Sequence, residues 1–299
     1  MRVLARPGYL LRRRVTALER HTPPAVAGEI EGIHQARVAS RRLREMLPLL
    51  AAVAGDHGMR SLRRDVRAIT QHLGPLREID VALGMLDGLA TSAPQHSAAI
   101  ALVRTRTALE RERMWPRVAR ALTKADVAHL LRRVRDMARQ IDSPPEKLRC
   151  AAIAAARLDA RMVRLDDAVR SVGVVYAAGP LHAARIALKK FRYALEIAAE
   201  LGRFRLDASF THLKSLQDLL GAMHDLQVLT GRVRDCEAAP NRTAPARRQL
   251  RGLVDELDQR VRQFHSVYLD ERSALVPVII RARRTAVTLG LMGGGSAGE

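Results

Sequence analysis

The chain carries one basic helical motif twice, and this repetition limits the folds that it can adopt. Residues 34–44 read His-Gln-Ala-Arg-Val-Ala-Ser-Arg-Arg-Leu-Arg, and residues 182–192 read His-Ala-Ala-Arg-Ile-Ala-Leu-Lys-Lys-Phe-Arg. The second copy starts 148 positions after the first and keeps the histidine and every cation. At about 100° per residue, an arc of about 80° holds His34, Arg37, Arg41 and Arg44. Since apolar residues occupy the opposite arc, each copy predicts a helix with one face in a core and one basic face.

A second pair of segments repeats at nearly the same offset. Leu73-Gly74 and Leu220-Gly221 lie 147 residues apart, and each precedes a cationic or imidazole residue, an acid and a valine. Those residues are Arg77, Glu78 and Val81 in the first copy and His224, Asp225 and Val228 in the second. Two matched segments with separate chemistry indicate an internal duplication.

The apolar pattern predicts an all-α fold of two pseudo-symmetric four-helix bundles that arise from this duplication. Breaks are expected at Pro23-Pro24, 55–58, 88–97, 143–145, 171–180, Gly202, 238–245 and Gly290, which leaves roughly four helices on each side of Pro180. We therefore expect one domain over residues 5–285, with a first helical repeat over 5–170 and a second over 180–285. A flexible tail is expected over 290–299.

The charge of the chain favours a polyanionic partner. Lysine and arginine number 51 against 31 acidic residues, which gives a formal net charge of +20. Only 3% of the residues are aromatic, whereas proteins that bind single-stranded nucleic acid usually stack bases on aromatic rings. The composition therefore points to phosphate without bases, and leaves weak nonspecific nucleic-acid binding open as an alternative.

The sequence shows no pattern typical of a membrane span, a signal peptide, a disulfide framework or a zinc site. No apolar run reaches the roughly 18 residues of a membrane span, so no membrane partner is expected, and the first residues lack the apolar core of a signal peptide. A cytoplasmic location is therefore expected. Cys150 and Cys236 are too few to make a disulfide framework or a zinc site, so neither is expected to do chemistry.

The paired motifs resemble the conserved histidine α-helical domain, called CHAD. The resemblance rests on His-x-x-Arg-x-x-x-Arg/Lys-Arg/Lys-x-Arg followed by a Leu-Gly-x-x-Arg/His-Asp/Glu element, and both copies over about residues 5 to 285 match it. It implies two pseudo-symmetric four-helix bundles and binding of inorganic polyphosphate along a basic surface, often with association with polyphosphate granules. Relatives fused to a triphosphate-tunnel hydrolase carry a Glu-x-Glu-x-Lys strand, which this sequence lacks.

The resemblance also implies which residues bind polyphosphate. In the first copy they are His34, Arg37, Arg41, Arg42 and Arg44, and in the second they are His182, Arg185, Lys189, Lys190 and Arg192. Arg67 and Lys214 match less distinctively, and Arg63 lies one turn from Arg67. The sequence departs slightly from the family where it has Arg77-Glu78, since an Arg-Asp pair is commoner there.

Interpretations without ligand binding stay open beside the binding hypothesis. A basic helical stripe is usually a solvated face, although its repetition favours binding. His34 and His182 either contact ligand or serve only structure, and a contacting histidine would raise the affinity as the pH falls through about 6.5. His224-Asp225 is a weak metal signal, and Asp225 is better explained by helix capping or interhelical pairing. The sequence has no glycine-rich loop that could hold a phosphate, so a polyphosphate-processing enzyme is the weaker alternative. No catalytic residue, metal or cofactor is expected.

Overall fold

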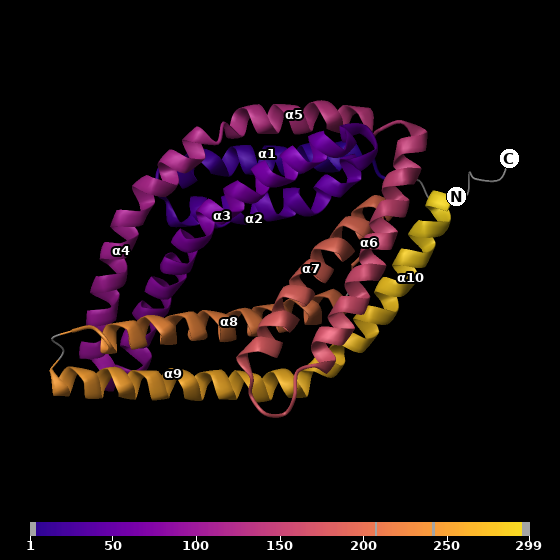
Figure 1. The fold of residues 1–299 in the computed structure, drawn as a ribbon. Coiled ribbons are helices and arrows are strands. Elements are labelled where there is room, and N and C mark those ends of the chain that lie inside the picture. The colour runs from indigo at the N-terminus through magenta and orange to yellow at the C-terminus, as the bar shows by residue number, and fades with distance from the viewer. Residues whose placement is uncertain (1–3, 207, 241–242, 295–299) are drawn as a thin grey trace.

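Ten α-helices and three short 3-10 helices make up the described part of the chain, which contains no strand (Figure 1). The computed structural model describes residues 4–206, 208–240 and 243–294. The α-helices are α1 (Pro7–Val26), α2 (Ile30–Met46), α3 (Ala51–Ser92), α4 (Ser97–Lys124), α5 (Val127–Gln140), α6 (Pro144–Arg170), α7 (Ala178–Gly202), α8 (Ala208–Glu237), α9 (Ala244–Glu271) and α10 (Leu275–Gly294). The all-α prediction is confirmed. None of these described helices is long and apolar enough to cross a bilayer.

Most predicted breaks fall between helices, and three do not. The chain turns near Gly28, whose φ of +85° suits glycine, so Pro23-Pro24 lie in the last turn of α1 instead. The expected break at 55–58 lies inside α3, because the chain turns earlier, through the 3-10 helix Leu47–Leu50. The predicted tail is helical as far as Gly294, and residues 295–299 lie outside the described residues.

The two-faced character predicted for the first basic helix is confirmed. The apolar arc of α2 and the turn after it is buried, with exposures from 0 to 4%, at Ala36, Ala39, Leu43, Met46, Leu47 and Leu50. Burying this arc leaves the basic arc on the other side of the helix, since positions three and four apart share one face. Core packing therefore sets the direction in which the cations of α2 point.

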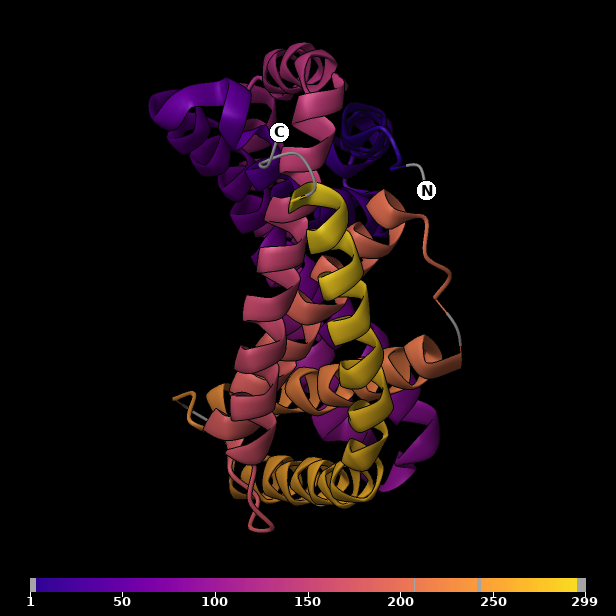
Figure 2. The same cartoon turned by 90° about the vertical axis from the view of Figure 1, so that its right-hand side faces the viewer.

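The helices gather around two cores, and the two long helices α3 and α8 contribute to both. One core takes residues from α1, α2, α5, α6, α7 and α10, from the first halves of α3 and α8, from the end of α4 and from the last part of α9. The other lies between the second halves of α3 and α8, the start of α4, and α9. Packing does not follow the expected division at Pro180, because α6, from the first half of the sequence, packs against α7 and α10 (Figure 2).

Candidate functional site

The basic faces of both repeats meet in one groove between α2, α3, α7 and α8. The groove has a volume of about 810 Å³. Its walls include eight of the predicted residues, namely His34, Arg37, Arg41, Arg44, His182, Arg185, Lys189 and Lys190. Motifs that lie 148 residues apart in sequence thus face a common space, which we call the central groove.

A buried polar contact fixes α2 on α3 beside the central groove. The Thr70 hydroxyl donates to the Ser40 hydroxyl at 3.1 Å, and Ser40 donates to the backbone carbonyl of Arg37 at 3.0 Å. Arg37 Nη1 donates across the interface to the Thr70 carbonyl at 3.1 Å. A Cβ at Gly74 would lie 2.9 Å from the same Nη1, so glycine at this position leaves room for the arginine. This gives a physical reason for the first Leu-Gly element.

The cations of the central groove crowd one another in a half-buried setting. Burial, followed by repulsion from Arg41 and Arg185, lowers the pKa of Lys189 to about 7. Burial and the charge of Arg41 also lower the pKa of Arg37 to about 10. Burial is the main cause of the lowered pKa of Arg41 and of Arg185 as well. The groove therefore holds more positive charge than its surroundings readily accommodate, and a bound anion would relieve the repulsion.

His34 and His224, in the wall of the central groove, are biased toward their neutral form. Burial and the charge of Arg185 lower the pKa of His224 to about 4, and its ring lies 5.3 Å from that of His182. Burial and Arg77 also lower the pKa of His34. Protonation of His34 is therefore expected at a lower pH than the 6.5 used in the sequence interpretation. Within the described residues, no three His, Cys, Asp or Glu side chains are grouped as a metal site.

Two of the four acidic residues that line the central groove, Glu78 and Asp225, support its arginines. Asp225 lies in the middle of α8, so the helix-cap interpretation is wrong. Its charge raises the pKa of Arg185, on α7, against the larger effect of burial, which supports the interhelical alternative. Burial raises the pKa of Asp225 itself. Glu78 acts in the same direction on Arg37. These acids help to keep the arginines charged.

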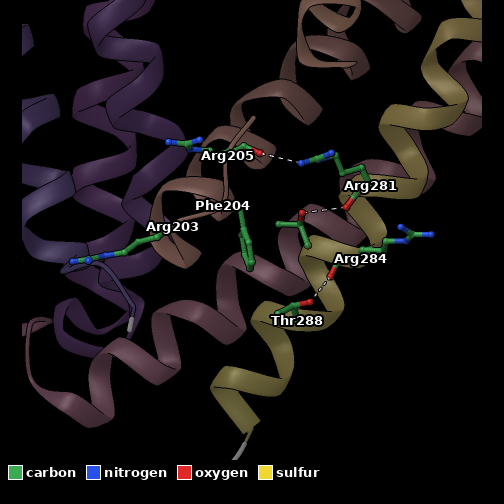
Figure 3. Close-up of a pocket in the computed structure, with 7 residues that line it drawn as sticks. Arg203, Phe204, Arg205, Arg281, Arg284 and Thr288 are labelled. Carbon is green, nitrogen blue, oxygen red and sulfur yellow. Dashed lines mark hydrogen bonds between the residues drawn. The ribbon is translucent and has the colours of Figure 1, made fainter. Parts of the chain in front are cut away.

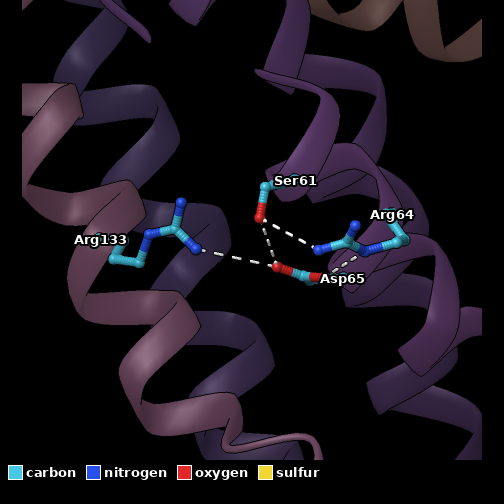
Figure 4. Close-up of polar contacts among 4 residues, drawn as sticks. All are labelled: Ser61, Arg64, Asp65 and Arg133. Carbon is cyan, nitrogen blue, oxygen red and sulfur yellow. Dashed lines mark hydrogen bonds and ion pairs between the residues drawn. The ribbon is translucent and has the colours of Figure 1, made fainter. Parts of the chain in front are cut away.

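Within the described part of the chain, the paired-motif cations that line the central groove have no close carboxylate partner. Among the described residues, no Asp or Glu oxygen within 4.0 Å forms an ion pair with Arg37, Arg41, Arg44, Arg185, Lys189 or Lys190. Figure 4 shows the contrasting arrangement, in which Asp65 of α3 accepts from Arg64 at 3.3 Å and pairs with Arg133 of α5 at 3.8 Å. Positive charge is compensated there by the protein, whereas the groove leaves it for a ligand.

Two residues of the basic motifs, Arg42 and Arg192, are not among the residues that line the central groove, and each lies close to Glu196. Arg192 lies 3.4 Å from Glu196 one turn further along α7, and its guanidinium stacks 5.1 Å from the Tyr193 ring centre. Arg42 is exposed, and its Nε lies 4.0 Å from the same carboxylate. The i,i+4 spacing of Arg192 and Glu196 was a signal of this pairing in the sequence.

Three further predicted residues, Arg63, Arg67 and Lys214, are not among the residues that line the central groove. Arg67 precedes Arg77, which lines the groove, by ten residues, or about 15 Å of helix, and Arg63 is one turn further away. Lys214 lies three residues before Gln217, which also lines the groove. All three predicted cations are exposed on α3 or α8. They therefore do not line the groove in which the paired motifs meet.

Sequence reasoning missed several residues that line the central groove. Arg77 and Glu78 served only as markers of the repeat, and His224 served as such a marker and as a weak metal signal, although each lies in the wall. Tyr193 directly follows the second basic motif, and its buried side chain also lines the groove. Gln217 and Asp218 carried no signal, since single polar residues on a helix are common.

A second arginine-rich pocket lies between the α7–α8 connection and α10 (Figure 3). Its volume is about 780 Å³, and its wall includes Arg203, Arg205, Arg281 and Arg284. Figure 3 shows Arg281 pointing toward the Arg205 carbonyl, to which it donates at 3.4 Å, while Arg203 and Arg284 point away from each other. The arginines of this pocket do not converge in the way that those of the central groove do.

Comparison with known proteins agrees with this architecture. The sequence matches the family model described as CHAD domain over residues 9–234. PptA from Streptomyces chartreusis is 18% identical with a TM-score of 0.61, and the alignment covers 94% of this chain and 97% of that chain. The CHAD domain crystal structure from the plant Ricinus communis is 21% identical with a TM-score of 0.61, covering 96% and 93%. No curated protein matches the sequence. At these identities the two structures establish a shared fold.

Proposed function

The chain belongs to the CHAD family, and from this premise we propose that it binds inorganic polyphosphate in the central groove without processing it. Family membership implies the ligand, and the gathering of cations in the central groove supports this choice of site. The observation that carries the proposal is the convergence of cations from both repeats in a groove where no carboxylate pairs with them closely.

The chemistry of the central groove suits a chain of phosphates. From His34 to Arg44 the axis of α2 rises about 15 Å, which is long enough to meet several phosphates in succession. Arginine presents planar forks that hydrogen-bond to two phosphate oxygens, while lysine acts as a compact charge. The first repeat contributes mainly arginines and the second contributes Lys189 and Lys190. A flexible polyanion needs repeated cations at similar spacing and little shape selection.

The same surface is poorly equipped to bind nucleic acid. Tyr193 and the imidazoles are the aromatic rings among the residues that line the central groove, and Tyr193 is 6% exposed. Base stacking on exposed aromatic side chains is the usual source of affinity for single strands. We therefore expect polyphosphate to be preferred over nucleic acid, and granule association in the cytoplasm to follow from this binding.

A titration with long-chain polyphosphate at several salt concentrations tests the proposal. The test variant carries Arg37→Ala, Arg41→Ala, Arg185→Ala and Lys189→Ala. The wild-type affinity should fall steeply with salt, because binding releases counterions. By analogy with single-stranded nucleic acid, removing four cations should lower the slope of log affinity against log salt by roughly 3.

A matched control separates the groove from general basicity. It removes four exposed arginines that pair with acids elsewhere, through Arg104→Ala, Arg139→Ala, Arg149→Ala and Arg234→Ala. This control has the same change in net charge and should bind nearly as the wild type does. Equal losses in both variants, or equal affinity for duplex DNA, would contradict the proposal. Phosphate release from polyphosphate by the wild type, lost in the groove variant, would favour an enzyme instead.

A further inference from the structure

The outward face of α10 carries a stripe of exposed apolar side chains. Val276, Ile280, Val287 and Leu291 are 58, 50, 57 and 73% exposed. On a helical wheel they fall within an arc of about 60°, so they form one line along the helix. The stripe is interrupted at its middle, because Arg283 and Arg284 lie in the turn between Ile280 and Val287. Single exposed apolar residues are ordinary, but four that share one helix face are not scattered, and exposed apolar patches mark interaction surfaces.

The stripe continues onto α6, which packs beside α10 (Figure 2). A pocket of about 580 Å³ lies between the two helices, with Met162 and Ile279 among its lining residues. Val163 of α6, 57% exposed, stands on the opposite wall from Val276 and Ile280. The exposed apolar surface therefore spans both helices, and we call it the α6–α10 face.

The two sides of the α6–α10 face carry opposite charge. Asp159 and Asp166 make the α6 side of the face acidic, and we call them the acidic edge. Arg283 and Arg284, which lie on either side of the apolar stripe, make the α10 side basic, and we call them the basic edge. The acidic edge is notable because the chain as a whole has a net charge of +20. Asp166 is partly compensated by Arg170 at 2.7 Å, while no ion pair within 4.0 Å involves Asp159 in the described part of the chain. An apolar centre with one acidic and one basic edge is complementary to itself.

We propose that the α6–α10 face binds the same face of a second copy of this chain and forms a two-fold dimer. In a two-fold contact each surface meets its own copy, so the acidic edge of one chain lies against the basic edge of the other twice. The apolar stripes are removed from water between them. An anionic membrane would attract the arginines of this face but would repel its acidic edge. The face does not include the helices that line the central groove, so the dimer is independent of polyphosphate binding.

Sedimentation velocity over a range of protein concentrations tests the dimer. The wild type should show a concentration-dependent monomer–dimer equilibrium, and Ile280→Asp with Val287→Asp should sediment as a monomer. Both side chains point outward, so the fold should be kept, which circular dichroism checks. The matched control places two aspartates at exposed apolar positions elsewhere, Ile30→Asp and Leu109→Asp, which are 53 and 46% exposed, and it should still dimerise.

A charge-reversal pair tests the two-fold arrangement itself. One variant reverses the acidic edge with Asp159→Arg and Asp166→Arg, and the other reverses the basic edge with Arg283→Glu and Arg284→Glu. Each variant alone should have a dimerisation affinity about tenfold lower than that of the wild type, because like charges then face each other. An equimolar mixture should recover dimers, since the mixed pair has opposite charges at both contacts.

A wild type that remains monomeric up to millimolar concentration would overturn the proposal. If that monomer sedimented with vesicles of anionic lipid, and the double aspartate variant did not, the face would be a membrane surface instead. Dimers that survive the aspartate substitutions would place the interface elsewhere. Two charge-reversed variants that stay monomeric when mixed would contradict the two-fold pairing.

Discussion

Lys189 should couple polyphosphate binding to proton uptake near neutral pH. Its ammonium group faces Arg37 and Arg41 of α2 and Arg185 and Arg192 of its own helix. Its charge also acts on Asp225 and His224 of α8. With a pKa of about 7 in the unbound protein, the side chain is mostly neutral above this pH. A bound phosphate favours the charged form, so binding above pH 7 takes up a proton.

The size of the effect follows from linkage between protons and ligand. If polyphosphate returns the pKa of Lys189 from about 7 to between about 9 and its ordinary value of 10.5, the affinity should fall roughly 25- to 50-fold from pH 7 to pH 9. The affinity must fall as the pH rises, because a higher pH removes the proton that Lys189 holds in the bound state. Below pH 6 the lysine is already charged, so it should contribute little pH dependence there.

Calorimetric titration with long-chain polyphosphate in buffers of different ionisation enthalpy measures this coupling. Proton uptake by the wild type should approach one per site at pH 8. The Lys189→Arg variant keeps a permanent charge and should lose the proton uptake attributed to the lysine while still binding at pH 9. Wild-type binding that is independent of pH from 7 to 9 would refute the reasoning, as would unchanged proton uptake in Lys189→Arg.

Three further predictions follow from individual contacts. Gly74→Ala should weaken polyphosphate binding severalfold without lowering the melting temperature, because the new Cβ displaces the guanidinium of Arg37 while alanine favours the helix. Arg111→Ala should lower the free energy of unfolding in urea by about 3–5 kcal/mol, because it leaves the buried carboxylate of Asp80 without the ion pair at 2.6 Å. Polyphosphate affinity should change by less than about threefold when alanine replaces the exposed cations Arg63, Arg67 and Lys214.

Each of these predictions has an internal comparison. Gly221→Ala adds a Cβ that meets nothing within 4 Å, so a loss of affinity equal to that of Gly74→Ala would refute the steric explanation. Arg104→Ala breaks an exposed pair with Asp87 and should cost less than about 1 kcal/mol. An equal cost for Arg104 and Arg111 would show that burial of the carboxylate does not matter. A strong affinity loss from the triple alanine variant would extend the site along α3 and α8.

The sequence carried enough information to predict the all-α fold and eight of the residues that line the central groove. The apolar arc of α2 had to enter a core, and this forced Arg37 and Arg41 to the other side. Repetition of the motif then suggested a shared site, and the structure places Arg185 and Lys189 in the same groove. The apolar pattern of one helix depends only on residues that are close in sequence, so the sequence alone can predict which face of the helix is buried.

What the sequence did not reveal depends on contacts between distant segments. Nothing in the order of helices said that α6 would pack on α7 and α10 across the expected boundary at Pro180. Arg42 matched the motif although it lies outside the arc that holds Arg41 on the helical wheel, and the approach of Glu196 from α7 could not be predicted from the sequence. The distance of Arg67 from Arg77 along α3 could have been worked out from the helical rise, but the position of the groove was unknown.

The most direct test of the central claim is a crystal structure of the protein with a short polyphosphate. The account predicts phosphate density along the central groove, with oxygens within hydrogen-bonding distance of Arg37, Arg41, Arg185 and Lys189. Density confined to the other arginine-rich pocket, beside Arg281, with an empty central groove would contradict it.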